Sequence, residues 1–145
     1  MNFKNHAKKL EQFLEEELSK NIPLLKINNS CLMYKKLKIK QLSTKNWLLS
    51  SIHGVAIHQF KLKASAVVAA KLYDQGKFQK FNEIKHLDSL FWQSFSDAEL
   101  FEEKIKTTRD FYKKDIFLAR YTIAKDRTKQ YKQKISSLFK STFDK

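Results

Sequence analysis

Three residues of this chain suggest catalysis: Asp74, Glu83 and Lys85. An aspartate followed by Glu-x-Lys is an arrangement in which two carboxylates hold Mg²⁺ while the lysine steadies the attacking water. That chemistry expects the glutamate and the lysine on a strand, whereas Glu83-Ile84-Lys85 has the pattern of the first turn of a helix. The helix dipole alone explains a glutamate there. Metal-dependent nuclease chemistry is therefore the less favoured hypothesis, and we expect a protein that is not an enzyme.

The other candidate metal ligands are scattered along the chain. His53 and His58 are five residues apart and would face opposite sides of a strand, and no cysteine or carboxylate cluster completes a metal set. With only two glycines, the chain has no Gly-rich phosphate loop. We expect no metal and no cofactor. His6 and His86 are likewise scattered. The aspartates do not share one helical face, so capping or surface ion pairing explains them better than metal binding: Asp88, Asp97, Asp110 and Asp115.

Positive charge is the strongest signal in the sequence. The chain has 29 Lys+Arg against 15 Asp+Glu, a formal net charge of +14. Such a balance favours attraction to polyanions and says little about fold. Residues 26–80 hold eleven lysines against one acid, and residues 104–145 hold thirteen basic residues against four acids. The acidic stretch 81–103 lies between these two basic regions.

We therefore expect a surface that contacts the phosphates of DNA or RNA, because lysines release condensed counterions when they meet phosphate. The alternative is that these lysines protect a sheet edge and that Trp47 is a core residue, not a platform for stacking bases. With few arginines, which bidentate recognition favours, binding would be independent of nucleic-acid sequence. The candidate contact residues are Lys36, Lys38, Lys40, Lys45, Trp47, Lys61, Lys63, Lys113, Arg120, Arg127 and Lys132, with Lys114, Lys125, Lys129 and Lys134 on the same predicted helix.

Residues 1–82 hold all the Gly and Pro residues and predict a small α-β-β-β-α unit. Apolar residues at steps of three and four predict an amphipathic helix from Phe3 to about Lys20, which ends before Pro23. Period-two patterns predict three antiparallel strands over about 32–42, 47–52 and 55–60, with turns at 43–46 and at His53-Gly54. A helix of small residues, 64–73, then ends with Gly76 in the C′ position.

Residues 83–145 contain no Gly or Pro and predict a helical region packed on the first unit as a single domain. A short helix over 83–94 would precede a capping box at Ser96-Asp97-Ala98-Glu99, which opens a long basic helix to about Phe139. Three outcomes remain open for this helix. It bends near 125–130 and folds back, it projects and pairs with another copy through residues 97–139, or its end is frayed.

The sequence thus predicts an α+β fold and a small, basic, non-enzymatic accessory protein that binds nucleic acid without sequence specificity. The alternative is an oligomerising interaction or assembly protein that uses the long C-terminal helix. The longest apolar runs are far shorter than the roughly 20 residues of a membrane span, and we expect a cytoplasmic protein. Heavy use of Lys, Asn and Phe suggests an AT-rich bacterial or phage genome. For a phage-encoded protein, the expected compartment is the cytoplasm of the host.

Overall fold

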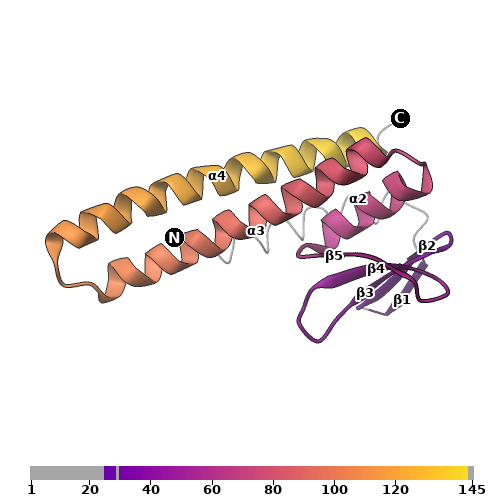
Figure 1. Ribbon diagram of the computed structural model, residues 1–145, viewed down its shortest axis with the longest axis horizontal. Helices are drawn as coiled ribbons and strands as arrows, with labels where there is room; N and C mark the ends of the chain where they lie inside the picture. The colour runs from indigo at the N-terminus through magenta and orange to yellow at the C-terminus, as the bar shows by residue number, and fades with distance from the viewer. Residues whose placement is uncertain (1–24, 29, 144–145) are drawn as a thin grey trace.

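The computed structural model describes residues 25–28 and 30–143 and confirms an α+β fold. An antiparallel sheet is followed by three helices, of which the last two are long and pack together (Figure 1). The helix predicted for residues 3–20 lies outside the described residues. The elements are β1 (Leu25–Asn28), β2 (Cys31–Tyr34), β3 (Leu37–Gln41), β4 (Trp47–Ser51), β5 (Ala56–Phe60), α2 (Lys63–Asp74), α3 (Phe78–Thr107) and α4 (Phe111–Phe143).

The sheet is a meander with the strand order β1-β2-β3-β4-β5, so the prediction of three strands was wrong. The segment predicted as one strand over 32–42 is a hairpin, in which Tyr34 pairs with Leu37 across a turn at Lys35-Lys36. Lys35 adopts a φ of 51°, a left-handed conformation that non-glycine residues rarely adopt. Its ammonium group donates to Asp74 at the end of α2 at 3.0 Å. A lysine in this conformation carries no turn signature, which is why the sequence pattern missed it.

The second half of the sheet follows the predictions closely. β4 and β5 occupy the expected segments, and Gly54 supplies the positive φ of 88° between them. Burial alternates along β3 and shows which face of the sheet each side chain occupies. Leu37 and Ile39 are buried, whereas Lys40 is exposed. One face of the sheet therefore packs on the helices, and the opposite face carries the lysines of β3.

Helix α2 lies between the sheet and the long helices (Figure 1). Its residues from Ala64 to Ala70 are all buried, and their small side chains let this helix lie close to the sheet. Gly76, with a φ of 70°, turns the chain after α2 into α3. Because both faces of α2 are covered, it is the central layer of the fold.

Helices α3 and α4 form an antiparallel hairpin, and two predictions about this region were wrong. The short helix predicted over 83–94 is part of α3, which continues through the expected capping box at Ser96. The expected boundary between residues 82 and 83 also lies inside α3. A capping motif only satisfies amide groups that lack carbonyl partners, and here the preceding turn supplies those carbonyls.

The chain turns at Thr108-Arg109-Asp110 and not near 125–130. Thr108 is extended, with a ψ of 130°, and Asp110 caps α4 because its Oδ1 accepts the Tyr112 amide at 2.9 Å. At the expected bend, Thr128 is buried, and its Oγ1 lies 2.8 Å from the Ala124 carbonyl oxygen and 3.0 Å from Ser94 Oγ. The polar stretch that suggested a break thus contains a polar contact between the two helices.

Alternate spacings of four and three residues define the face of α4 that packs on α3. This is the heptad spacing of helices packed side by side. At the distal end the rings of Phe101 and Phe117 stack with centroids 6.3 Å apart. The stripe consists of Phe117, Tyr121, Ala124, Thr128, Tyr131, Ile135 and Leu138, all buried or half-buried.

Asp88 is a buried carboxylate that joins α3 to the start of α2. It is 3% exposed, and its two oxygens accept the backbone amides of Lys61 at 2.8 Å and Leu62 at 3.1 Å. Leu62 is the N-cap position of α2 and has no side-chain cap of its own. Asp88 therefore performs from another helix the role that an N-cap side chain usually performs locally.

Replacing Asp88→Ala should lower the free energy of unfolding by about 1–3 kcal/mol, because two amides at the start of α2 lose their acceptor. Urea denaturation followed by circular dichroism measures the change. The exposed acid Asp97 provides the control, since Asp97→Ala should change the stability by less than about 0.5 kcal/mol. Equal effects of the two substitutions would contradict the capping role.

The pH dependence of stability provides a second test of Asp88. Burial raises the pKa of its carboxyl above the ordinary 3.8, although the amides of Lys61 and Leu62 oppose the shift. Because the pKa of Asp88 is raised in the folded state, the contribution of this group to stability is full below pH 3.8. That contribution is lost as the pH rises through the raised pKa. The native protein should therefore lose stability relative to Asp88→Asn over that interval. A difference that stays constant or grows with pH would contradict the assignment.

Candidate nucleic-acid interface

A straight row of basic side chains runs along one exposed face of α4. Its members are seven residues apart, and because seven residues make almost two full helical turns, they lie nearly in line. Over the 21 residues from first to last the row is about 32 Å long. All its members are exposed, and we call them the basic row: Lys113, Arg120, Arg127 and Lys134.

The basic row has no acidic partner within the part of the chain that the structure describes. The Arg120 guanidinium lies 6.0 Å from the centre of the Phe101 ring, and the Lys134 ammonium lies 5.9 Å from that of Tyr131. Helical geometry places Asp115 and Asp126 of α4 on other faces. No acid among the described residues pairs with the positive charges of the row.

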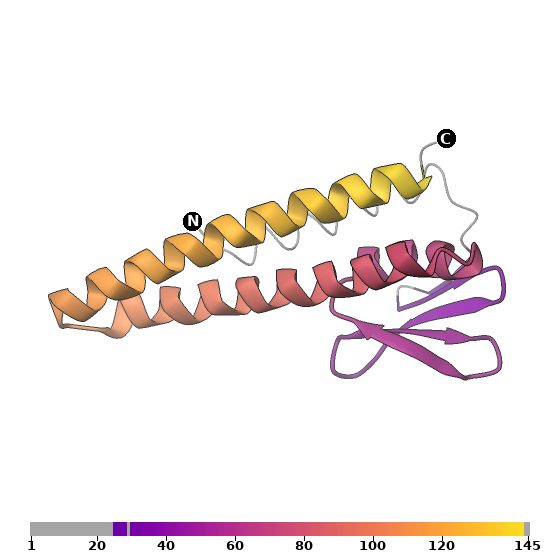
Figure 2. The same ribbon diagram turned by 45° about the horizontal axis from the view of Figure 1, so that its top comes forward.

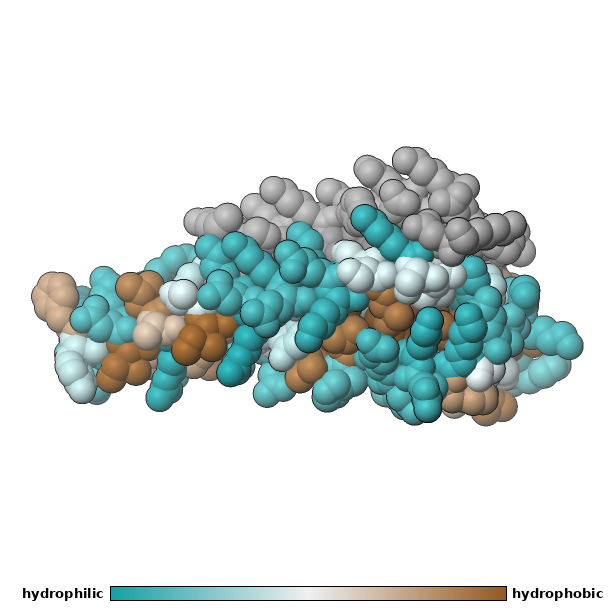
Figure 3. All heavy atoms as spheres, turned by 90° about the horizontal axis from the view of Figure 1, so that it is seen from above, coloured by the Kyte–Doolittle hydropathy of each residue, from teal (hydrophilic) through white to brown (hydrophobic). Residues whose placement is uncertain are grey.

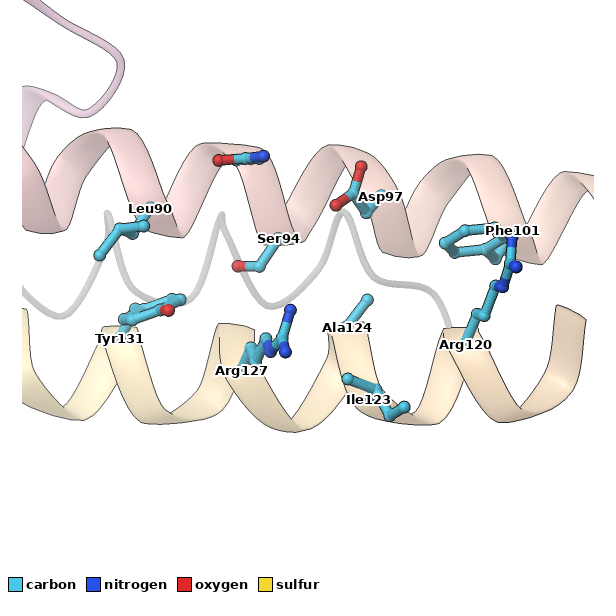
Figure 4. Close-up of a pocket in the computed structure, with 10 residues that line it drawn as sticks. Leu90, Ser94, Asp97, Phe101, Arg120, Ile123, Ala124, Arg127 and Tyr131 are labelled. Carbon is cyan, nitrogen blue, oxygen red and sulfur yellow. The ribbon is translucent and has the colours of Figure 1, made fainter.

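A groove between α3 and α4 follows the basic row and encloses about 330 Å³. Figure 4 shows Arg127 reaching from α4 toward Ser94 of α3, and Arg120 extending beside Phe101. Asp97 is the acid in this lining. The groove thus combines two guanidinium groups with partly apolar walls; it is lined by Leu90, Gln93, Ser94, Asp97, Phe101, Arg120, Ile123, Ala124, Arg127 and Tyr131.

The predicted contact residues of the sheet are divided among several environments. Lys38 and Lys40 lie on the outer face of β3, while Lys36 and Lys45 occupy the turns at its two ends. The ammonium of Lys61 lies 5.8 Å from the centre of the Trp92 ring. Only the lysines of β3 and its turns form a continuous basic surface on the sheet.

Trp47 and Lys63 lie in the interior. Trp47 is 8% exposed and Lys63 is 7% exposed, and the ammonium of Lys63 lies 5.5 Å from the centre of the indole ring. Tyr34 is also buried. The interpretation of Trp47 as a core residue therefore fits its position, because a covered ring offers no face to a base.

The two basic regions do not share one face. The sheet packs on one side of α2 and α4 lies beyond the other side (Figures 1 and 2). The lysines of β3 lie on the sheet face opposite α2, whereas the basic row lies on α4. Lys132 belongs to α4 but is half-buried and lies off the row. The sequence placed all four members of the row on the predicted long helix, but it grouped them with other basic residues of that helix and did not single out their seven-residue spacing.

The residues that suggested catalysis lie in separate places. Asp74 pairs with Lys35 at 3.0 Å at the end of α2, whereas Glu83 and Lys85 lie in α3. Burial, and next the charge of Lys85, lowers the pKa of His58 below its ordinary value. Across residues 25–28 and 30–143 no group of three His, Cys, Asp or Glu side chains gathers that could hold a metal ion.

Comparison with known protein families, with curated proteins and with solved structures finds no match for this chain. None of its described helices is long and apolar enough to span a membrane.

Proposed function

We propose that this protein is a small non-enzymatic accessory protein that binds nucleic acid through backbone phosphates, without sequence specificity, along the basic row of α4. One observation carries the proposal: Lys113, Arg120, Arg127 and Lys134 are exposed, aligned and free of acidic partners among the described residues. Basic side chains elsewhere on the surface are more scattered.

The dimensions of the row suit a polyanion. Successive members are about 10.5 Å apart along the helix axis, while duplex DNA presents about one phosphate charge per 1.7 Å. Each basic group therefore finds a phosphate near it whatever the base sequence. The row spans roughly the length of one turn of duplex, which is about 34 Å.

The lysines of β3 are a separate and weaker candidate surface. Lys40 is exposed, but Lys38 is half-buried beside Met33 and Ser50, its neighbours across the sheet. Because this surface faces away from α4, one straight duplex cannot contact both. We assign the main contact to α4 for that reason.

Fluorescence anisotropy with a short labelled DNA or RNA, titrated at several salt concentrations, tests the proposal. Four phosphate contacts on duplex DNA should give a slope of log affinity against log salt of about −3.6, which is a loss of roughly 100-fold between 50 and 200 mM. Sequence-scrambled oligonucleotides should bind equally well. Absence of binding at about 50 mM salt would overturn the proposal.

Three variants with the same change in net charge locate the surface. Arg120→Gln/Arg127→Gln removes two members of the row and should bring the slope to about −1.8. Lys114→Gln/Lys129→Gln removes two exposed lysines on other faces of the same helix and should leave the slope nearly unchanged. An equal loss in both variants would show that net charge, not the row, determines binding.

The third charge-matched variant, Lys38→Gln/Lys40→Gln, tests the sheet. It should behave like the control on α4, because the proposed contact does not include β3. A slope that falls in this variant and not in Arg120→Gln/Arg127→Gln would move the contact from α4 to the sheet.

A second function, assembly through the long helices, is favoured by a different observation. The distal part of the hairpin exposes large apolar side chains, among them Phe111 at 85% and Tyr112 at 76%. Exposed apolar surface of this extent marks interaction sites in soluble proteins.

A further inference from the structure

A second apolar stripe lies on the outside of α4. Its members are spaced by four, three and four residues, the same heptad spacing as the stripe that packs on α3. At 100° per residue this outer stripe is centred about 140° away from the α3-facing one. We call it the outer stripe: Tyr112, Ile116, Ala119 and Ile123, all exposed.

The outer stripe is confined to the distal half of α4. Apolar side chains appear on the surface of this end of the hairpin (Figure 3, left). Phe111 and Leu118 are also exposed but lie on another face of α4, with Leu118 51% exposed. Beyond Ile123 the same face of α4 carries Gln130, Gln133 and Ser137, which are polar. An α4 partner therefore has to cover residues 112–123 and no more.

We propose that the outer stripe binds the outer stripe of a second copy, with the two α4 helices antiparallel. This pairing closes with two-fold symmetry, as most homodimers do. It sets Tyr112 against the partner's Ile123, and Ile116 against the partner's Ala119. Each large side chain near the centre thus meets a small one, so the helices can approach closely.

The extent of the stripe fits this arrangement. When the two stripes overlap, the start of the partner's α4 lies beside residue 124. The contact between the two helices therefore ends where the outer face of each helix becomes polar. In a parallel pairing the polar faces beyond residue 124 would also lie side by side, and nothing apolar would cover them.

Charges at the two ends of the stripe complement each other only in the antiparallel arrangement. There, Asp126 lies beside the turn that carries the partner's Arg109, once at each end. Both residues are exposed, and neither has an ion-pair partner among the residues described. A parallel pairing would instead set each of them against its own copy. Lys113 and the partner's Arg120 meet at the solvent-exposed rim, where salt screens their repulsion.

The dimer does not depend on nucleic-acid binding, but it affects the basic row. Antiparallel pairing places both rows on the same side of the dimer and joins them at Lys113 and Arg120. The combined row would be about 50 Å long from one Lys134 to the other. Each protein dimer would then present a longer polyanion-binding surface than a single chain does.

Light scattering on the full chain tests the dimer directly. The native protein should have twice the monomer mass, and Ile116→Glu/Ile123→Glu should be a monomer with an unchanged circular dichroism spectrum, because both side chains are exposed. The matched control is Ile52→Glu/Val55→Glu, which alters two exposed apolar residues at the β4–β5 turn and should remain a dimer. A native protein that is monomeric at its highest attainable concentration overturns the proposal.

A charge exchange tests the orientation without removing apolar surface. Asp126→Arg alone should raise the dissociation constant of the dimer, since it sets two arginines against each other. The exchanged variant Asp126→Arg/Arg109→Asp should restore the dissociation constant of the native dimer. Failure of the second substitution to rescue the first would overturn the antiparallel pairing.

A distance between spin labels separates the two orientations. A label at Gln130→Cys in a Cys31→Ala background should report about 40 Å across an antiparallel dimer and about 10 Å across a parallel one. The short distance would overturn the proposal. Mass and distance are both measured without nucleic acid, so a failure here leaves the proposed phosphate binding to be judged by its own titration.

Discussion

The fold depends on one constraint, that α2 is covered on both faces. A helix in the middle layer can lie close to a sheet and to two long helices only if its side chains are small, and residues 64–70 of α2 are alanine, serine and valine. Burying them stabilises the fold by roughly 25 cal/mol per Å² of apolar surface. Asp88 adds a directional contact, because it fixes the start of α2 to α3. Sheet, α2 and hairpin are thereby held in one arrangement.

This arrangement frees part of the hairpin for other contacts. The proximal half of α3 and α4 covers α2, and the distal half projects beyond the sheet without another described element packed on it (Figure 1). The core of the distal half is narrow, consisting of contacts such as Phe101 with Phe117. The outer stripe lies on this distal half, and the basic row begins there and continues to Lys134.

Local signals predicted those elements whose boundaries are set by local chemistry. Gly54 and Gly76 marked a hairpin turn and a helix end, because positive φ costs glycine little. The turn at Lys35 and the turn before Asp110 were missed, since tertiary contacts stabilise both. Lys35 is held by Asp74, and the helices on either side of Asp110 are held by their packing on each other. The capping motif at Ser96 failed for the opposite reason, because a local signal was overridden by continuous packing along α3.

The sequence by itself determined the α+β class, the excess of positive charge and the placement of most of it on two segments. It also determined that α4 carries Lys113, Arg120 and Arg127. Only the tertiary structure decided which of these charges act together. Side-chain direction depends on where a helix begins, ends and packs, and the turn at residue 109 fixed the rotation of α4. That rotation aligned the basic row, left the outer stripe exposed, and separated both from the lysines of the sheet.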